Sequence, residues 1–97
     1  MLLLPEAVTL REARDTLSML AQALRRDTAD VLTVDASPLR DLDSAALAVL
    51  LECRRLAQAW GKKFEVHRAP IKLVELAKLY GVERLLALQP GPAAQAP

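Results

Sequence analysis

The residues that could do chemistry gather between positions 35 and 44. Asp35, Asp41 and Asp43 stand close together in the sequence, and Ser44 follows the last of them directly. Paired carboxylates act as general acid and base only where they converge on a cleft and a further group orients them. Aspartates in a loop after a strand more often cap helices and form turns. Because no orienting group accompanies these three, the pattern favours a structural role and does not predict an enzyme.

A serine–histidine–aspartate triad could be assembled from Ser44, His67 and one aspartate. The residues around Ser44 do not form a nucleophile elbow, and His67 occupies a solvent-facing position of a predicted strand. Cys53 is the single cysteine and stands among apolar residues of a predicted helix, so we expect an unreactive core thiol. With one histidine, one cysteine and three scattered glycines, the sequence predicts no metal site, phosphate-binding loop or cofactor.

The charge balance argues against nucleic acid as a partner. Thirteen basic and twelve acidic residues leave a net charge of +1, and the short basic pairs 54–55 and 62–63 have no interleaved aromatic residues. The apolar start MLLLP lacks the length and the basic flank of a signal peptide, and no stretch reaches the roughly 18 apolar residues of a transmembrane helix. We therefore expect a cytoplasmic protein that does not insert directly into a membrane.

Strands and helices alternate along the chain. The strands are predicted at 2–4, 30–37 and 63–68, and the helices at about 10–26, 44–60 and 71–80. Crossover helices join strands that run mostly parallel, so the pattern predicts an α/β fold with helices packed on a central, mostly parallel sheet. Aromatic residues are only 3% of the chain and hydrophobic residues 53%, so the core must consist of Leu, Val and Ala.

The helix boundaries and inward faces follow from capping signals and spacing. Thr9 and Glu12 have the spacing of a capping box, and Gly61 and Gly81 are left-handed helix stops. The predicted inward residues are Leu10, Ala13, Leu17, Leu20, Ala21 and Leu24 in the first helix, Cys53, Leu56, Ala57 and Trp60 in the second, and Ile71, Val74, Leu76, Ala77 and Tyr80 in the third.

The C-terminal part is predicted in two pieces. Residues 82–88 should add a turn or a short helix to a single domain that spans residues 1–88. Residues 89–97 hold three of the six prolines, which predicts a disordered tail rich in proline and alanine.

Ser44 has two interpretations at the start of the second helix. As a cap it would accept a hydrogen bond from an unpaired backbone amide, at a stabilisation of about 1 kcal/mol. The same position suits a docking or phosphorylation site, because free amides and the positive end of the helix dipole face it, although Asp43 disfavours a second negative charge. The following residues, AALAVLL, are apolar all round the helix. Either the domain itself buries them or a partner covers part of them.

The order of these pieces resembles the STAS domain, the fold of anti-sigma-factor antagonists. The strand VLTVDAS is followed by the loop PLRDLD and then by SAALAVLLECRRLAQAWGKKFEVH. The family typically has an apolar strand, an aspartate, a loop, an Asp-Ser or Asp-Thr pair, an apolar helix, Gly-Lys and another strand. The likeness covers about residues 2–86, and ELAKLYGV looks like the last helix of the MlaB-like members in particular.

This resemblance implies a noncatalytic subunit. MlaB-like subunits bind and support the cytoplasmic ATPase of a phospholipid-transport ABC complex that maintains outer-membrane lipid asymmetry. A permease would be an indirect partner, and the chain would be peripheral to the inner membrane through the ATPase. By likeness, Ser44 takes the family's hydroxyl position in the surface that meets the ATPase. The partner-binding residues that we predict are Ser37, Arg40, Asp41, Asp43, Ser44 and Leu47, joined by Ala48 and Leu51.

An anti-sigma-factor antagonist is the second function that the resemblance implies. In such proteins a partner kinase phosphorylates the equivalent serine, which would make Ser44 a phosphorylation site. Ala45 and Ala46 replace the small residue and glycine that often follow this hydroxyl, and this departure argues against a switch. The short N-terminus leaves little room for the family's first hairpin. It therefore exposes a sheet edge through which the isolated chain could form a homodimer.

Overall fold

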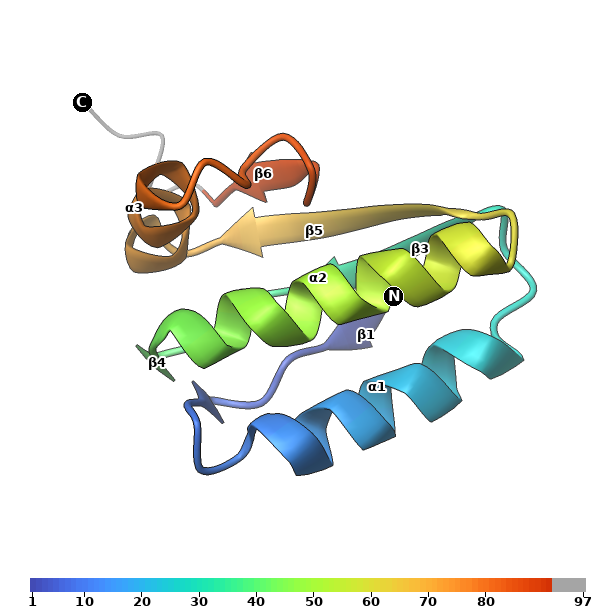
Figure 1. Ribbon diagram of the computed structural model, residues 1–97, viewed down its shortest axis with the longest axis horizontal. Coiled ribbons are helices and arrows are strands. Elements are labelled where there is room, and N and C mark those ends of the chain that lie inside the picture. Colours follow the sequence, from blue (N-terminus) through green and yellow to red (C-terminus); the bar gives the residue numbers. More distant parts are fainter. Residues whose placement is uncertain (92–97) are drawn as a thin grey trace.

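Within residues 1–91, three α-helices alternate with β-strands (Figure 1). The computed structural model describes residues 1–91. The elements are β1 (Leu2–Leu3), β2 (Ala7–Val8), α1 (Ala13–Arg26), β3 (Val31–Asp35), β4 (Asp41–Leu42), α2 (Ser44–Ala59), β5 (Lys63–Ala69), α3 (Ile71–Leu79) and β6 (Leu88–Pro90). A four-stranded sheet has the order β1-β3-β5-β6, β2 pairs with β4, and every pairing is parallel. The predicted α/β class with a parallel central sheet is confirmed.

The helices cover one face of the sheet. Each crossover leads to the next strand in the same direction, and right-handed crossovers of this kind place successive helices on the same side. Figure 1 shows α1 and α2 side by side in front of the sheet, with α3 near the end of β5. On the opposite face, side chains such as Val31, Thr33, Glu65 and His67 are exposed or half-buried. We call this the open sheet face.

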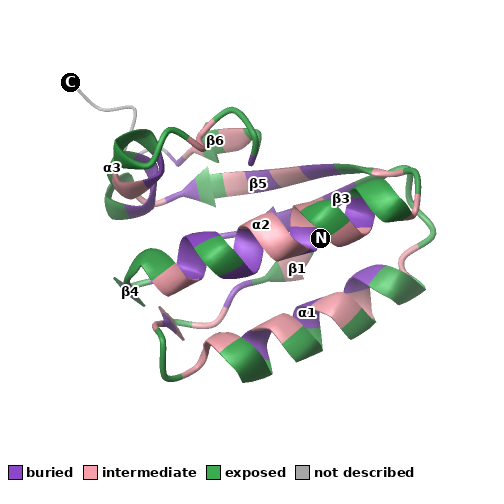
Figure 2. Cartoon of the chain, viewed as in Figure 1, coloured by how far each residue is buried: buried purple, intermediate pink, exposed green. Residues whose placement is uncertain are grey.

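The core lies between the sheet and the helices, where Figure 2 shows buried positions along the inner sides of α1 and α2. Alternate residues of the central strands supply it, with Leu32 and Val34 from β3 and Phe64 and Val66 from β5. Phe64 is its one aromatic member among the described residues, and the rest are Leu, Val, Ala and Cys53. The predicted aliphatic core is therefore confirmed.

Helix α1 begins later than its spacing predicts. Its inward stripe is confirmed from Ala13 to Leu24, but Leu10 precedes the helix and is 81% exposed, so the prediction that Leu10 faces the core is wrong. The capping-box contact forms in part. The Thr9 amide donates to the Glu12 carboxylate at 2.9 Å, whereas the Glu12 amide donates to the Thr9 carbonyl and not to its hydroxyl.

Helix α3 buries a narrower face than predicted. Val74 and Ala77 are buried, and so is Leu73, which the spacing did not select. Ile71 and Tyr80 are 53% and 58% exposed, so their placement in the core is wrong. The helix is only nine residues long and contacts α2 and β6 along one side, which leaves both of its ends in solvent.

The segment after α3 is not a helix. Residues 83–87 form turns, and β6 then pairs in parallel with β5. Gln89 and Pro90 belong to this strand, and the amide of Gly91 donates to the carbonyl of Ala69 at 3.0 Å. The ordered domain thus extends past the predicted boundary at residue 88. The rest of the predicted tail, residues 92–97, lies outside the described residues.

Candidate functional site

Several hydrogen bonds hold the loop before α2. The Ser37 amide donates to Asp35 Oδ1 at 2.9 Å. The amides of Arg40 and Asp41 both donate to the carbonyl of Glu6, at 2.8 and 3.0 Å. The sequence predicted an irregular loop here and missed β4, which pairs with β2. With the backbone fixed, the side chains of Ser37, Arg40 and Asp41 remain exposed at this end of the domain.

Asp43 caps α2, and Ser44 does not. The Asp43 Oδ1 atom accepts a hydrogen bond from the Ala45 amide at 2.8 Å, and Oδ2 accepts one from the Leu10 amide at 3.2 Å. Ser44 is the first helical residue, and its hydroxyl makes no hydrogen bond within residues 1–91. The interpretation of Ser44 as the cap is therefore wrong. One carboxylate instead ties the start of α2 to the residues that lead into α1.

The first half of α2 presents a narrow stripe to solvent. Ser44 and Ala48 are exposed and Leu51 is half-buried, as expected for residues three and four apart on one helix face. Leu47 was predicted in the same surface, but it is only 4% exposed because its side chain turns toward the core. It can therefore contribute only the edge of its side chain to an interface.

Two apolar grooves flank this stripe. The first, which we call the α1 groove, has a volume of about 570 Å³ and separates α1 from α2. Its lining residues are Leu10, Ala13, Arg14, Leu17, Asp43, Ser44, Ala45, Ala48 and Val49. The second, the α3 groove, has a volume of about 230 Å³ and is lined by Ser44, Leu47, Ala48, Leu51, Tyr80 and Val82. Ser44 and Ala48 line both grooves, so they form a low ridge between them.

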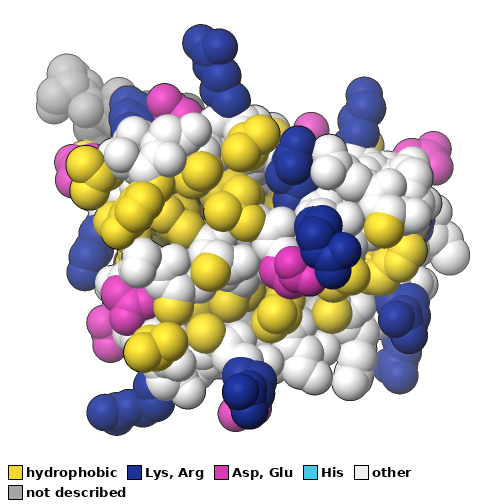
Figure 3. All heavy atoms as spheres, in the orientation of Figure 1, with side chains coloured by type: hydrophobic (Ala, Val, Ile, Leu, Met, Phe, Trp, Pro, Cys, Tyr) yellow, Lys and Arg dark blue, Asp and Glu magenta, His cyan; other side chains and the backbone are white. Residues whose placement is uncertain are grey.

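Large apolar side chains stand beside these grooves. Leu10 is 81% exposed at the α1 groove, and Leu79 and Tyr80 are 78% and 58% exposed at the end of α3. Figure 3 shows apolar side chains gathered over this end of the helical face, with lysines and arginines mainly around its periphery. None of these three residues was predicted from the sequence to belong to the site. Apolar residues just outside a helix start or at a helix end were the available signal, but spacing alone assigned Leu10 and Tyr80 to the core.

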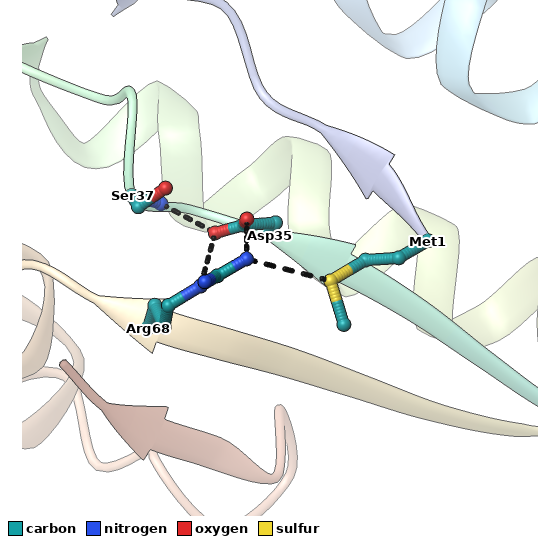
Figure 4. Close-up of polar contacts among 4 residues, drawn as sticks. All are labelled: Met1, Asp35, Ser37 and Arg68. Carbon is teal, nitrogen blue, oxygen red and sulfur yellow. Dashed lines mark hydrogen bonds and ion pairs between the residues drawn. The ribbon is translucent and has the colours of Figure 1, made fainter.

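A second polar cluster lies on the open sheet face (Figure 4). Asp35 is 2% exposed and accepts hydrogen bonds from Arg68, with Nε at 3.2 Å from Oδ1 and Nη2 bonded to Oδ2. Arg68 Nη2 also lies 4.0 Å from the sulfur of Met1. The Arg68 side chain is 56% exposed, so its outer part is solvated. Arg68 was not among the residues predicted from the sequence to have a role.

The carboxylate of Asp35 remains charged despite its burial. Desolvation acts to raise its pKa, but the amide of Ser37 and the guanidinium of Arg68 oppose it and hold the pKa below the ordinary value of 3.8. A general base needs a pKa near the working pH and access to a substrate proton. Asp35 has neither property, so its arrangement fits a structural anchor.

The remaining candidate catalytic groups do not converge. His67 Nε2 lies 2.9 Å from Glu65 on the same strand, while Asp43 is occupied by two amides at the start of α2. Burial, with a smaller effect of Glu52, raises the pKa of the Cys53 thiol to about 12, in agreement with an unreactive core cysteine. Within residues 1–91 no cluster of three or more His, Cys, Asp or Glu side chains could hold a metal ion, and no helix is long and apolar enough to span a membrane.

The fold and this surface define a class of protein. A small parallel α/β layer here exposes a helix start between two apolar grooves, and surfaces of this kind are common in domains that bind a partner.

Comparison with known families identifies this domain. The chain belongs to the STAS-domain family: the family model described as "Mlab, STAS domain" matches residues 1–89. STAS domains are generally noncatalytic binding domains. A search of curated proteins gave no match.

Proposed function

We propose that this chain is a noncatalytic, MlaB-like STAS subunit that binds and supports the ATPase of a phospholipid-transport ABC complex. In this role it would serve a complex that maintains the lipid asymmetry of the outer membrane. The observation that carries the proposal is the ridge of Ser44 and Ala48 between two apolar grooves. The description of the matching family model supports the same reading.

The shape of the ridge suits a protein partner. Its central side chains are small, so a partner's backbone or helix can approach α2 closely. Larger side chains of the partner can then fill the α1 groove and the α3 groove on either side. The exposed Leu10, Leu79 and Tyr80 supply apolar contact area that water solvates poorly.

Polar groups at the ridge can set the orientation of the partner. The Ser44 hydroxyl has no hydrogen-bond partner within residues 1–91, so it is available both as a donor and as an acceptor. Arg14 lines the α1 groove and makes no ion pair with any described residue. Ser37, Arg40 and Asp41 stay in the predicted surface as exposed residues of the preceding loop. The ATPase would hold the chain at the cytoplasmic side of the inner membrane, and the permease would be reached only through it.

Titration calorimetry with the purified ATPase subunit tests this proposal. Ser44→Arg should weaken binding by about tenfold or more, because a long charged side chain would fill the approach to both grooves. Ala59→Arg is the matched control, since it places the same side chain at an exposed position of α2 about 22 Å along the helix from Ser44. Equal affinities for wild type and Ser44→Arg would remove the ridge from the interface, and no binding by wild type would refute the proposal.

An anti-sigma-factor antagonist regulated at Ser44 is the second candidate. The Ser44 hydroxyl is exposed and makes no hydrogen bond with a described residue, which favours this candidate because a kinase could reach the group. Asp43 disfavours this candidate. Its carboxylate accepts a hydrogen bond from the Ala45 amide, which holds it next to Ser44, so it would repel the negative charge of a phosphate there.

Native mass spectrometry of the tagged chain from its own cells separates the two candidates. A form heavier by about 80 Da at Ser44, together with a serine kinase, would favour the switch, as the added group is one phosphoryl. In that case Ser44→Asp should abolish partner binding and Ser44→Ala should preserve it. Recovery with an ABC ATPase and a permease would favour the transport subunit.

A further inference from the structure

Arg68 occupies an irregular position in β5. Between the paired positions Val66–Leu88 and Ala69–Pro90, β5 has two residues where β6 has only Gln89, which is a β-bulge. Strict alternation would turn Arg68 toward the helices, on the same side as Val66. The bulge directs it to the open sheet face and returns Ala69 to the core, where Ala69 is fully buried.

The backbone of Arg68 is left-handed, with φ of 54°. A residue with a Cβ atom adopts this region at a cost, so the surrounding structure must hold it there. In return, the guanidinium reaches across to the end of β3 and bonds both oxygens of Asp35 (Figure 4). We call this two-point contact the Asp35–Arg68 clamp.

Asp35 connects this clamp to the predicted docking surface. Its Oδ1 atom accepts hydrogen bonds from Arg68 Nε and from the amide of Ser37. Ser37 is the second residue of the loop that leads to α2. Arg68 thus holds the Asp35 side chain in one rotamer, and the Asp35 carboxylate in turn holds the start of the loop through the Ser37 amide. Ser37 itself is exposed, and the loop continues through Arg40 and Asp41 to the cap at Asp43.

We propose that Arg68 is a positioning residue for partner binding, which acts from the open sheet face through Asp35 on the loop that carries Ser37 and Arg40. This inference rests on the proposed function, because the loop belongs to the surface assigned to the ATPase. It adds that a residue on the face opposite the grooves controls affinity without touching the partner.

Substitutions at Arg68 can separate the clamp from the backbone strain. Arg68→Gly removes the guanidinium from the buried Asp35 carboxylate, which costs stability, but it also relieves the left-handed backbone, which offsets part of that cost. Arg68→Lys keeps a positive charge but cannot bond both carboxylate oxygens. Glu65→Ala is the matched control, since it breaks the Glu65–His67 contact on the same strand and face without touching the loop.

Two measurements are made on each variant. Amide hydrogen exchange of Ser37, followed by NMR on the chain alone, reports the hydrogen bond to Asp35. Calorimetry with the purified ATPase subunit reports affinity, with Ser44→Arg measured alongside. For Arg68→Gly we expect the Ser37 amide to exchange about tenfold faster and the affinity to fall by about tenfold, with Arg68→Lys intermediate and Glu65→Ala unchanged.

The outcomes distinguish the clamp from the proposed function. If Arg68→Gly leaves both measurements at the wild-type values, the inference is overturned. Faster exchange of Ser37 with unchanged affinity also overturns it, provided that Ser44→Arg still weakens binding, and the proposed function then stands. If wild type fails to bind the ATPase, the proposed function fails and takes the inference with it, whatever the exchange rates show. Should Arg68→Gly not fold, Arg68→Lys decides by the same two measurements.

Discussion

Replacing Asp43 should destabilise the domain far more than replacing its neighbour Asp41. Both are exposed aspartates of the segment that leads to α2, and they stand two residues apart. The Asp43 carboxylate accepts hydrogen bonds from the amides of Ala45 at 2.8 Å and of Leu10 at 3.2 Å, whereas the Asp41 side chain makes no hydrogen bond with a described residue. The two positions therefore share charge and exposure but differ in the bonds that they make.

The expected magnitude follows from these two bonds. Loss of a helix N-cap costs about 1 kcal/mol. The bond to Leu10 is long and exposed to solvent, so it adds only about 0.5–1 kcal/mol, which is below the usual range for a charged acceptor. Asp43→Ala should therefore lower the free energy of unfolding by about 1.5–2 kcal/mol, and Asp41→Ala by less than about 0.5 kcal/mol. Asp43→Ser restores the cap but cannot reach Leu10, so its loss should lie between these values.

Urea denaturation at pH 7, followed by far-UV circular dichroism, measures the differences. For a domain of this size the loss in Asp43→Ala corresponds to a Tm lower by about 6–16 °C. If Asp43→Ala and Asp41→Ala prove equally stable, the two hydrogen bonds that Asp43 accepts from Ala45 and Leu10 contribute nothing to the stability of the domain. The account of how α1 and α2 are tied together would then be wrong.

Three further outcomes are expected. Because the pKa of Asp35 lies below 3.8 in the folded chain, its charged form stabilises the fold above that pH and this contribution is lost as the pH falls through the folded pKa. Asp35→Asn should accordingly cost about 1–3 kcal/mol at pH 7 and flatten the acid limb of a stability–pH curve, and an unchanged limb would assign the acid sensitivity elsewhere. Cys53, with its pKa near 12 and no exposed surface, should resist a thiol reagent at pH 8 until the chain is unfolded, and rapid labelling of the native chain would contradict its burial. Gly61 has φ of 73°, and a Cβ atom added there would meet no other atom within 4 Å. Gly61→Ala should therefore lower the free energy of unfolding by about 1 kcal/mol through backbone strain alone. A melting temperature at or above that of wild type would refute this.

Periodicity predicted the elements that bury a regular face. The alternation of Phe64 and Val66 in β5 and the spacing of Leu17, Leu20 and Leu24 in α1 each reflect packing against one neighbour. Such patterns are local, so the sequence contains them in full. The alternating order of these elements was then enough to predict parallel pairing and a single α/β layer.

The choice between Asp43 and Ser44 as the cap could not be made locally. Aspartate and serine are nearly equal N-cap residues, and they stand side by side. A contact 33 positions away in the sequence favours Asp43, because its second oxygen also accepts the Leu10 amide. The capping interpretation was thus correct for the helix and wrong for the residue.

Arg68 and β6 were missed for the same physical reason. The bulge that turns Arg68 outward exists only in the pairing of β5 with β6, and β6 itself is three residues long. From the sequence, residues 82–88 have helix-like spacing, and nothing local indicates that Ala87 adopts φ of 48° and leads into a strand. An arginine at a core-facing position of an alternating strand was the one available sign of the bulge.

The apolar circumference of α2 now has a specific explanation. Ala46, Leu47, Val49 and Leu50 are buried within the domain itself, against the sheet and the neighbouring helices, so most of the run needs no partner. An exposed alanine such as Ala48 is ordinary on a protein surface and would not by itself indicate an interface. Docking is instead indicated by the surroundings of Ala48. The Ser44 hydroxyl makes no hydrogen bond with a described residue, two apolar grooves lie on either side, and large apolar side chains beside the grooves are exposed to solvent.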